Sequence, residues 1–145
     1  MNTITIELLG LQTALNAFSA LEARTTSLRP LWEKFADEFY IQERQLFDAA
    51  PWKPLTPAYA ERKRRIFGDK PILRATDTLF HSLTQKGAEG SIYRVLDQEV
   101  EFGSSVPYGI FHVPTRNPLA EPDEDRYLTI AGEYLVEAVR ESGFN

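Results

Sequence analysis

Hydrophobic residues recur along this chain with a period that changes from segment to segment, and each period predicts a different element. Over 3–8, isoleucine and leucine alternate with polar residues, which is the two-residue period of a half-buried strand. Over 11–24, apolar residues recur at steps of three and four, which predicts a helix with one apolar face. The polar residues 25–27 then interrupt this helix.

The segment 28–47 predicts a longer amphipathic helix. Its leucines and aromatic residues fall at helical spacing, and charged residues, Glu43 among them, fall on the other faces. We expect the aromatic side chains to pack in the core rather than to form a groove for a partner, because aromatic stripes usually bury themselves. An apolar surface larger than one domain can cover would reverse this interpretation.

Prolines shape the middle of the chain. Three prolines within 51–57 make this stretch stiff without making it a strand. Thr56 followed by Pro57 is typical of a helix N-terminus, with threonine as the cap and proline at the first helical position. The predicted helix covers 57–66, and Gly68 ends it.

A second helix start follows an extended connector that begins at Lys70-Pro71. We expect the hydroxyl of Thr76 to cap this helix by accepting a hydrogen bond from the N–H of Thr78 or Leu79. The short helix then continues to about residue 83, with apolar residues on the side that faces the core.

The next segments predict an antiparallel hairpin. Residues 91–96 and 99–102 are rich in β-formers and alternate in polarity, and Asp97-Gln98 lies between them as a turn. Together with the predicted strand at 3–8, the hairpin gives a sheet of at least three strands. Residues 106–112 then predict a short helical turn, in which Tyr108 and His112 share one face.

The last predicted helix covers about 123–141 and ends at Gly143. Four residues lie along one face of it, and three more apolar residues lie beside them. The first set is Leu128, Ala131, Leu135 and Val139, and the second is Ile130, Tyr134 and Ala138.

These elements predict an α+β fold, with helices packed on one side of a small, mainly antiparallel sheet and a proline-rich connector crossing between them. The chain has 145 residues, of which 43% are hydrophobic, so we expect a single domain over 1–145 with a core of its own.

Composition narrows the classes of function. The chain has no cysteine, so it has neither disulfides nor thiolate metal ligands, and we expect cytosolic synthesis. No apolar run approaches the roughly 20 residues of a membrane span, and residues 1–3 lack the features of a signal peptide. The net charge of −5 disfavours nucleic acid as the partner and favours proteins.

One ordered set of motifs resembles a known family. The order is W-x-P-L-T-P-x-Y, a basic run, I-L-R-x-T-D-x-L-x-x-S, and later F-G-S-x-V-P-Y-G-x-x-H. The matching residues are Trp52, Pro54, Leu55, Thr56, Pro57, Tyr59, Arg62, Lys63, Ile72, Leu73, Arg74, Thr76, Leu79, Ser82, Gly103, Ser104, Val106, Pro107, Tyr108 and His112, with Asp-Glu-Asp-Arg at the start of the last helix.

With this order the chain resembles the phage virion morphogenesis family, the tail-completion proteins of Mu-like contractile-tailed phages and prophages. The resemblance extends from Trp52 to the end of the sequence. It departs at 113–118, a short loop that lacks the glycine pair family members usually carry after the histidine.

The resemblance implies a structural protein rather than an enzyme, and we expect neither a cofactor nor a metal. It implies a role in tail completion and head–tail joining, in the tail or neck region of the virion, after assembly in the host cytoplasm. Its partners would be further copies of itself, in a ring for which a hexamer is the expectation, and tail tube, terminator or neck proteins. The alternatives are a head–tail connector or neck protein, or a DNA-contacting module that uses the basic run.

Candidate chemistry in the sequence is sparse. His81 and Ser82 could form a base and a nucleophile, but neighbours on a helix point about 100° apart and would not face each other. His112 is expected to be a partly buried imidazole with a structural role, hydrogen-bonded to backbone or to a carboxylate. The cluster Glu121, Asp123, Glu124 and Asp125 lacks the spacing of a calcium loop and is typical of a helix start.

Two oppositely charged segments are candidates for an interface. Arg62, Lys63, Arg64 and Arg65 form the densest basic run, and Glu121, Asp123, Glu124 and Asp125 form the acidic segment. A ring requires two different, complementary patches on each subunit, and these segments would supply them. The other interpretation of the basic run is a solvated helix face, whose charge is favourable near the helix C-terminus.

Overall fold

The computed structural model describes residues 11–143, which contain five α-helices, one 3₁₀ helix and one hairpin. The helices are α1 (Leu11–Thr26), α2 (Arg29–Ala49), α3 (Pro57–Phe67), α4 (Thr78–Thr84), η1 (Pro107–His112) and α5 (Glu124–Glu141). Strands β1 (Ser91–Val95) and β2 (Val100–Ser104) form a two-stranded antiparallel sheet. The fold is therefore α+β, as predicted, and the predicted strand at 3–8 lies outside the described residues.

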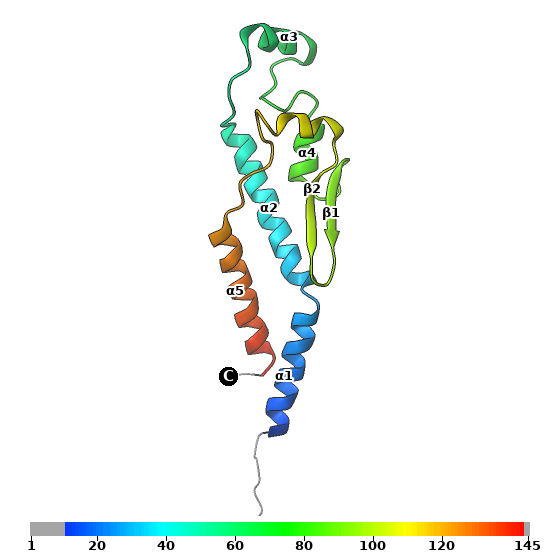
Figure 1. The fold of residues 1–145 in the computed structure, drawn as a ribbon, viewed down its shortest axis with the longest axis vertical. Helices are drawn as coiled ribbons and strands as arrows, with labels where there is room; N and C mark the ends of the chain where they lie inside the picture. The colour runs from blue at the N-terminus through cyan, green and yellow to red at the C-terminus, as the bar shows by residue number, and fades with distance from the viewer. Residues whose placement is uncertain (1–10, 144–145) are drawn as a thin grey trace, which may run out of the picture.

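Helix α2 runs through the middle of the molecule, and other elements pack on both of its sides (Figure 1). Helix α5 lies along one side, and α4 with the hairpin lies along the other. Helices α1 and α2 follow one another along the long axis, and α3 lies at the opposite end of the molecule from α1. The molecule is therefore elongated, and the helices at its two ends have few neighbouring elements.

Two separate clusters of buried side chains hold these elements together. The hairpin core consists of Phe47, Leu79, Leu83 and Val106, with Phe39, Trp52, Leu73 and Phe80 packed against it. The α5 core consists of Leu31, Ile130 and Tyr134, with Leu28, Trp32, Phe35 and Ala131 packed against it. The aromatic residues of α2 thus pack in the core, as the sequence predicted.

Several local predictions are confirmed because they depend on neighbouring residues alone. Thr56 caps α3 by accepting a hydrogen bond from the N–H of Tyr59 at 3.4 Å. Gly68, with φ +80°, ends that helix. The carboxylates expected at the start of the last helix also lie there, and Asp123 is the N-cap residue of α5, where its carboxylate accepts from the N–H of Arg126 at 3.1 Å.

The hairpin turn is attached to the junction between α1 and α2. The backbone N–H of Leu28 donates to the carbonyl of Asp97 at 2.7 Å. The Asp97 carboxylate accepts from Arg29 Nε at 2.9 Å and from the Ser27 hydroxyl at 2.9 Å. These bonds, led by that from Arg29, hold the pKa of Asp97 below its usual range. Residues about 70 positions apart in the sequence thereby fix the register of the sheet against α2.

The predicted cap of α4 is wrong. Asp77, not Thr76, is the N-cap residue, and it has a left-handed backbone with φ +60° and makes no side-chain cap bond. The Thr76 hydroxyl instead donates to the hydroxyl of Thr78 at 3.2 Å. The left-handed turn at Asp77 redirects the chain, so the Thr76 side chain does not reach the free N–H groups of the helix.

The apolar face of α5 also differs from the prediction. Ile130, Tyr134 and Ala138 are buried, whereas Leu128 and Leu135 are 69% and 47% exposed. The structure therefore buries the set that the sequence placed beside the main stripe. The helix carries two apolar faces, and only one of them has a partner within the described chain.

The hairpin core supplies the first test. Leu83 on α4 is 0% exposed, and Leu83→Ala should lower the free energy of unfolding by about 2–5 kcal/mol because it removes buried methyl groups and leaves a cavity. The matched control is Ile66→Ala on α3, where Ile66 is 61% exposed, and its effect should stay within about 0.5 kcal/mol. Urea denaturation measures both, and equal effects would contradict this core.

Candidate functional site

A pocket of about 610 Å³ lies between α3, the connector 68–76 and the segment from η1 to Arg116. Its apolar lining consists of Leu55, Tyr59, Phe67, Ile72, Leu73 and Ala75. Its polar lining consists of Thr56, Lys63, Thr76, Tyr108, His112 and Arg116. A cavity with an apolar wall and a few converging polar groups is the usual form of a binding site.

Nine of the twenty residues named above for the family resemblance line this pocket. They are Leu55, Thr56, Tyr59, Lys63, Ile72, Leu73, Thr76, Tyr108 and His112. Trp52 and Leu79 belong to the hairpin core instead. The carbonyl of Pro54 accepts from Arg116, Pro107 begins η1, and Gly103 lies opposite Ile92 in the sheet. Motif segments that are far apart in the sequence are thus brought together at one place.

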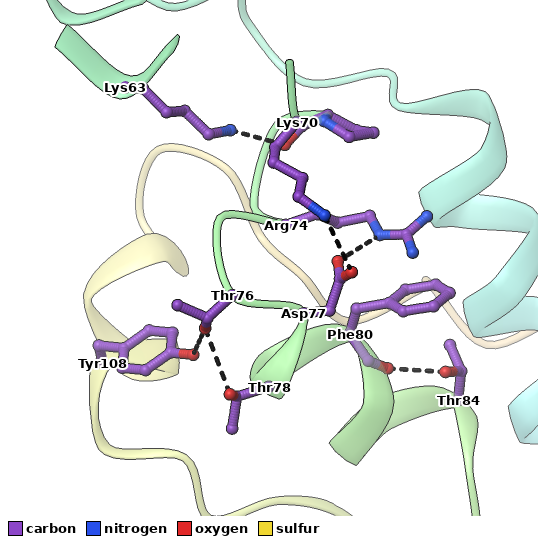
Figure 2. Close-up of polar contacts among 10 residues, drawn as sticks. Lys63, Lys70, Arg74, Thr76, Asp77, Thr78, Phe80, Thr84 and Tyr108 are labelled. Carbon is purple, nitrogen blue, oxygen red and sulfur yellow. Dashed lines mark hydrogen bonds and ion pairs between the residues drawn. The ribbon is translucent and has the colours of Figure 1, made fainter. Parts of the chain in front are cut away.

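Lys63 is the most unusual member of the lining. It is only 8% exposed, although its neighbours Arg62, Arg64 and Arg65 are all exposed. Its ammonium donates to the carbonyl of Pro71 at 2.6 Å (Figure 2). No carboxylate among the described residues lies within ion-pair distance of it, and burial lowers its pKa. Lys63 is therefore a buried cation whose charge has no counter-ion within the described chain.

Arg116 is the second cation of the lining, and it too is bonded to backbone carbonyls. Its Nε donates to the carbonyl of Lys53 at 2.6 Å, and a terminal nitrogen donates to the carbonyl of Pro54 at 2.9 Å. The indole N–H of Trp52 donates to the carbonyl of Asn117 at 2.7 Å. These three bonds attach the short loop after His112 to the proline-rich segment.

The wall formed by the connector is held in an unusual conformation. Leu73 and Asp77 both have left-handed backbones, with φ +64° and +60°, which is costly for residues other than glycine. Asp77 accepts from Arg74 at 2.8 Å and lies 3.8 Å from the ammonium of Lys70 (Figure 2). The Arg74 guanidinium also lies 3.6 Å from the centre of the Phe80 ring. These contacts fix the shape of the pocket wall.

His112 contacts Tyr108, as the sequence predicted, but not in the way expected. The two rings meet edge to face with centroids 6.5 Å apart. Within the described part of the chain the imidazole has no hydrogen bond to backbone or to a carboxylate, so that expectation is wrong. Burial, and then the charge of Arg116, lower the pKa of His112. The neighbours of the imidazole are therefore the Tyr108 ring and the Arg116 cation.

The predicted basic run is not one continuous charged surface. Lys63 turns into the pocket, while Arg64 and Arg65 remain on the surface and pair with Glu61 at 2.8 and 3.8 Å. The acidic residues Glu121, Asp123, Glu124 and Asp125 are all exposed. The two segments belong to different parts of the molecule, since α3 lies at one end and the start of α5 lies along its side (Figure 1).

The fold separates His81 from Ser82, the two residues considered as a base and a nucleophile. His81 is exposed, whereas Ser82 is 0% exposed and bonds to the Leu79 carbonyl at 2.7 Å and the Ser104 hydroxyl at 2.6 Å. The two side chains do not face each other. Among residues 11–143, no three histidine, aspartate or glutamate side chains gather closely enough to hold a metal ion. No helix in this range is long and apolar enough to cross a membrane.

Comparison of the chain with protein-family models, with curated proteins and with solved structures gave no match.

The predicted position of one titratable residue, Glu43, is wrong. Glu43 was placed on a polar face of α2, but it is 0% exposed and accepts from the N–H of Ala120 at 2.6 Å. Burial raises its pKa to about 7, and the Ala120 N–H opposes only part of that rise. The signal was present, because Ala36, Tyr40, Glu43 and Phe47 recur at steps of four, three and four and are all buried.

The position of Glu43 predicts an unusual dependence of stability on pH. Its folded-state pKa of about 7 lies above the ordinary glutamate value of 4.5, so the folded protein holds a proton that the unfolded chain releases between these pH values. The protonated Glu43 carboxyl therefore contributes to the free energy of unfolding in full below pH 4.5, and this contribution is lost as the pH rises to about 7. It amounts to about 3 kcal/mol.

Glu43→Gln isolates that contribution, because glutamine keeps an acceptor for the Ala120 N–H and cannot ionise. The stability of the variant relative to the wild-type protein should rise by about 3 kcal/mol between pH ~5 and pH ~8, measured by urea denaturation. Glu33→Gln, at an exposed position of the same helix, is the control. Parallel pH profiles for wild type and Glu43→Gln would contradict the buried carboxyl.

Proposed function

We propose that the protein is a structural virion assembly protein, which acts in phage tail completion and head–tail joining by self-association and by docking on tail or neck proteins. The ordered motif from Trp52 to the last helix supports the choice of process. The observation that carries an assembly role is the second apolar face of α5, which nothing in the described chain covers.

This second face is continuous along the helix. At 100° per residue, Leu128, Leu135 and Val139 lie within about 40° of one another, and they are 69%, 47% and 38% exposed. Val136, next to this stripe, is 58% exposed. On the neighbouring helix α1, Leu15 is 50% exposed. Exposed apolar side chains grouped in this way support a role in protein–protein contact.

The two charged segments would determine how the subunits are oriented in such an assembly. The exposed arginines of α3 and the carboxylates at 121–125 lie on different parts of one subunit, which is the arrangement that a heterologous, ring-forming interface requires. Exposed ion pairs contribute only about 0–1 kcal/mol each. The affinity therefore comes from the apolar face, and the charges select orientation and register.

A genetic test addresses the function directly. Deletion of the gene from the phage or prophage that carries it should yield separate heads and unjoined tails in electron micrographs, and a wild-type copy should restore joined particles. Intact joined particles without the gene would contradict the proposal.

The same complementation assay tests the apolar face. The double variant Leu128→Glu with Leu135→Glu should fail to restore joined particles, because buried carboxylates would oppose assembly, while its circular dichroism and urea denaturation stay close to wild type. Glu133→Gln, an exposed change on the same helix, should complement fully. Full complementation by the double variant would exclude the α5 face from the interface.

A further inference from the structure

The pocket beside α3 has an excess of positive charge that the described chain does not balance. Its two basic side chains, Lys63 and Arg116, donate to the carbonyls of Pro71, Lys53 and Pro54. None of the residues that line the pocket is an aspartate or a glutamate. The site therefore has hydrogen-bond partners for its cations but no counter-charge.

A buried cation in this state favours an anionic ligand. Lys63 is more than nine-tenths buried, and its ammonium has three N–H donors, of which one is used by Pro71. Removing a charge from water is costly unless an opposite charge is placed beside it. A carboxylate that entered the pocket would accept from the remaining donors and would compensate the charge.

The apolar part of the pocket determines which side chain can bind next to the carboxylate. Leu55, Phe67, Ile72 and Leu73 form an apolar wall beside Lys63. Packing a large apolar side chain against this wall is favourable, because it removes apolar surface from water. The left-handed backbone of Leu73 and the Arg74–Asp77 pair hold this wall in place before any ligand arrives, so little ordering is required on binding.

The chain itself carries an exposed segment with this combination of groups. In the segment 119–125, Leu119 is 43% exposed and is followed by the exposed carboxylates of Glu121 and Asp123. Its backbone is held on α2, where the N–H of Ala120 donates to Glu43 at 2.6 Å and that of Asp123 to Gln42 at 3.4 Å. None of its residues lines the pocket of the same subunit.

We propose that the pocket binds the segment 119–125 of a second copy of this chain, with the Leu119 side chain against the apolar wall and the Glu121 carboxylate at Lys63. This inference rests on the self-association proposed above and names the contact that gives it direction. Because pocket and segment are different surfaces of one subunit, the contact is heterologous and repeats from subunit to subunit.

A peptide-binding experiment tests the contact. The probe is a fluorescein-labelled peptide with the sequence of residues 117–125, titrated with the full-length protein and followed by fluorescence anisotropy. Two control peptides carry Glu121→Gln and Leu119→Ser. The proposal predicts saturable binding of the parent peptide and binding weaker by about tenfold or more for each control. Equal binding of parent and Glu121→Gln peptides would overturn it.

Variants of the protein locate the site. Lys63→Met should weaken binding of the parent peptide by about tenfold or more, whereas Arg65→Gln, an exposed change on the same helix, should change it less than about threefold. Equal losses of peptide affinity for the two variants would mean that the peptide is attracted generally to a basic helix, and would overturn the pocket as its binding site.

A second pair of variants keeps the test valid if Lys63→Met fails to fold. Tyr59 lies at the edge of the pocket and is 56% exposed, so Tyr59→Glu adds a negative charge at little risk to folding. It should weaken peptide binding by about tenfold, whereas Tyr59→Gln should weaken it less. Unchanged binding by Tyr59→Glu would overturn the proposal.

The two proposals can fail separately. A protein that self-associates but does not bind the peptide overturns the pocket contact and leaves the assembly role standing. A protein that stays monomeric at every concentration contradicts self-association, and with it the second copy as the occupant. Binding of free glutamate as tight as that of the peptide would assign the pocket to small carboxylates and overturn the segment as its ligand.

Discussion

Helix α2 has to bury apolar side chains on two sides, and the rest of the architecture depends on this. Toward its N-terminal half, Leu31 packs with Ile130 and Tyr134 of α5. Toward its C-terminal half, Phe47 packs with Leu79 and Leu83 of α4 and with Val106, two residues beyond β2. No single element covers both sides, so α5 and the hairpin with α4 occupy opposite flanks (Figure 1). The molecule is consequently elongated, with a thin layer on each side of one central helix.

A thin layer cannot cover every apolar face that its helices carry. Helix α5 uses Ile130, Tyr134 and Ala138 against α2 and leaves Leu128 and Leu135 in solvent. A further layer of protein is needed to bury them, and in our proposal other subunits and tail proteins supply it. The same geometry places the pocket of α3 and the acidic segment on separate surfaces. An assembly that joins these surfaces buries apolar area and balances charge at once.

The sequence predicted those features that are decided by neighbours in the chain. The cap at Thr56, the end of α3 at Gly68 and the hairpin over 91–104 follow from local propensity and alternation, and the structure contains them. Local rules fail where tertiary packing decides. The left-handed turn at Asp77 displaced the expected cap by Thr76. Which of two apolar stripes α5 buries depends on α2, so α5 alone does not reveal it.

The candidate site was predictable only in part for the same reason. The motif residues were identified one by one, but the sequence did not show that Lys63, Leu73 and Tyr108 line one pocket. Their meeting depends on the connector folding back over α3, which is a long-range event. Glu43 was missed because charge was given more weight than spacing, although the buried stripe 36, 40, 43, 47 includes it.

Self-association through surfaces that one chain cannot bury alone should be visible in the native mass of the purified protein. Light scattering should be recorded over a concentration series at low and at high salt. We expect a discrete multiple of the monomer mass that dissociates on dilution, more readily at high salt because the charged contacts are screened. A strict monomer under all of these conditions would contradict it.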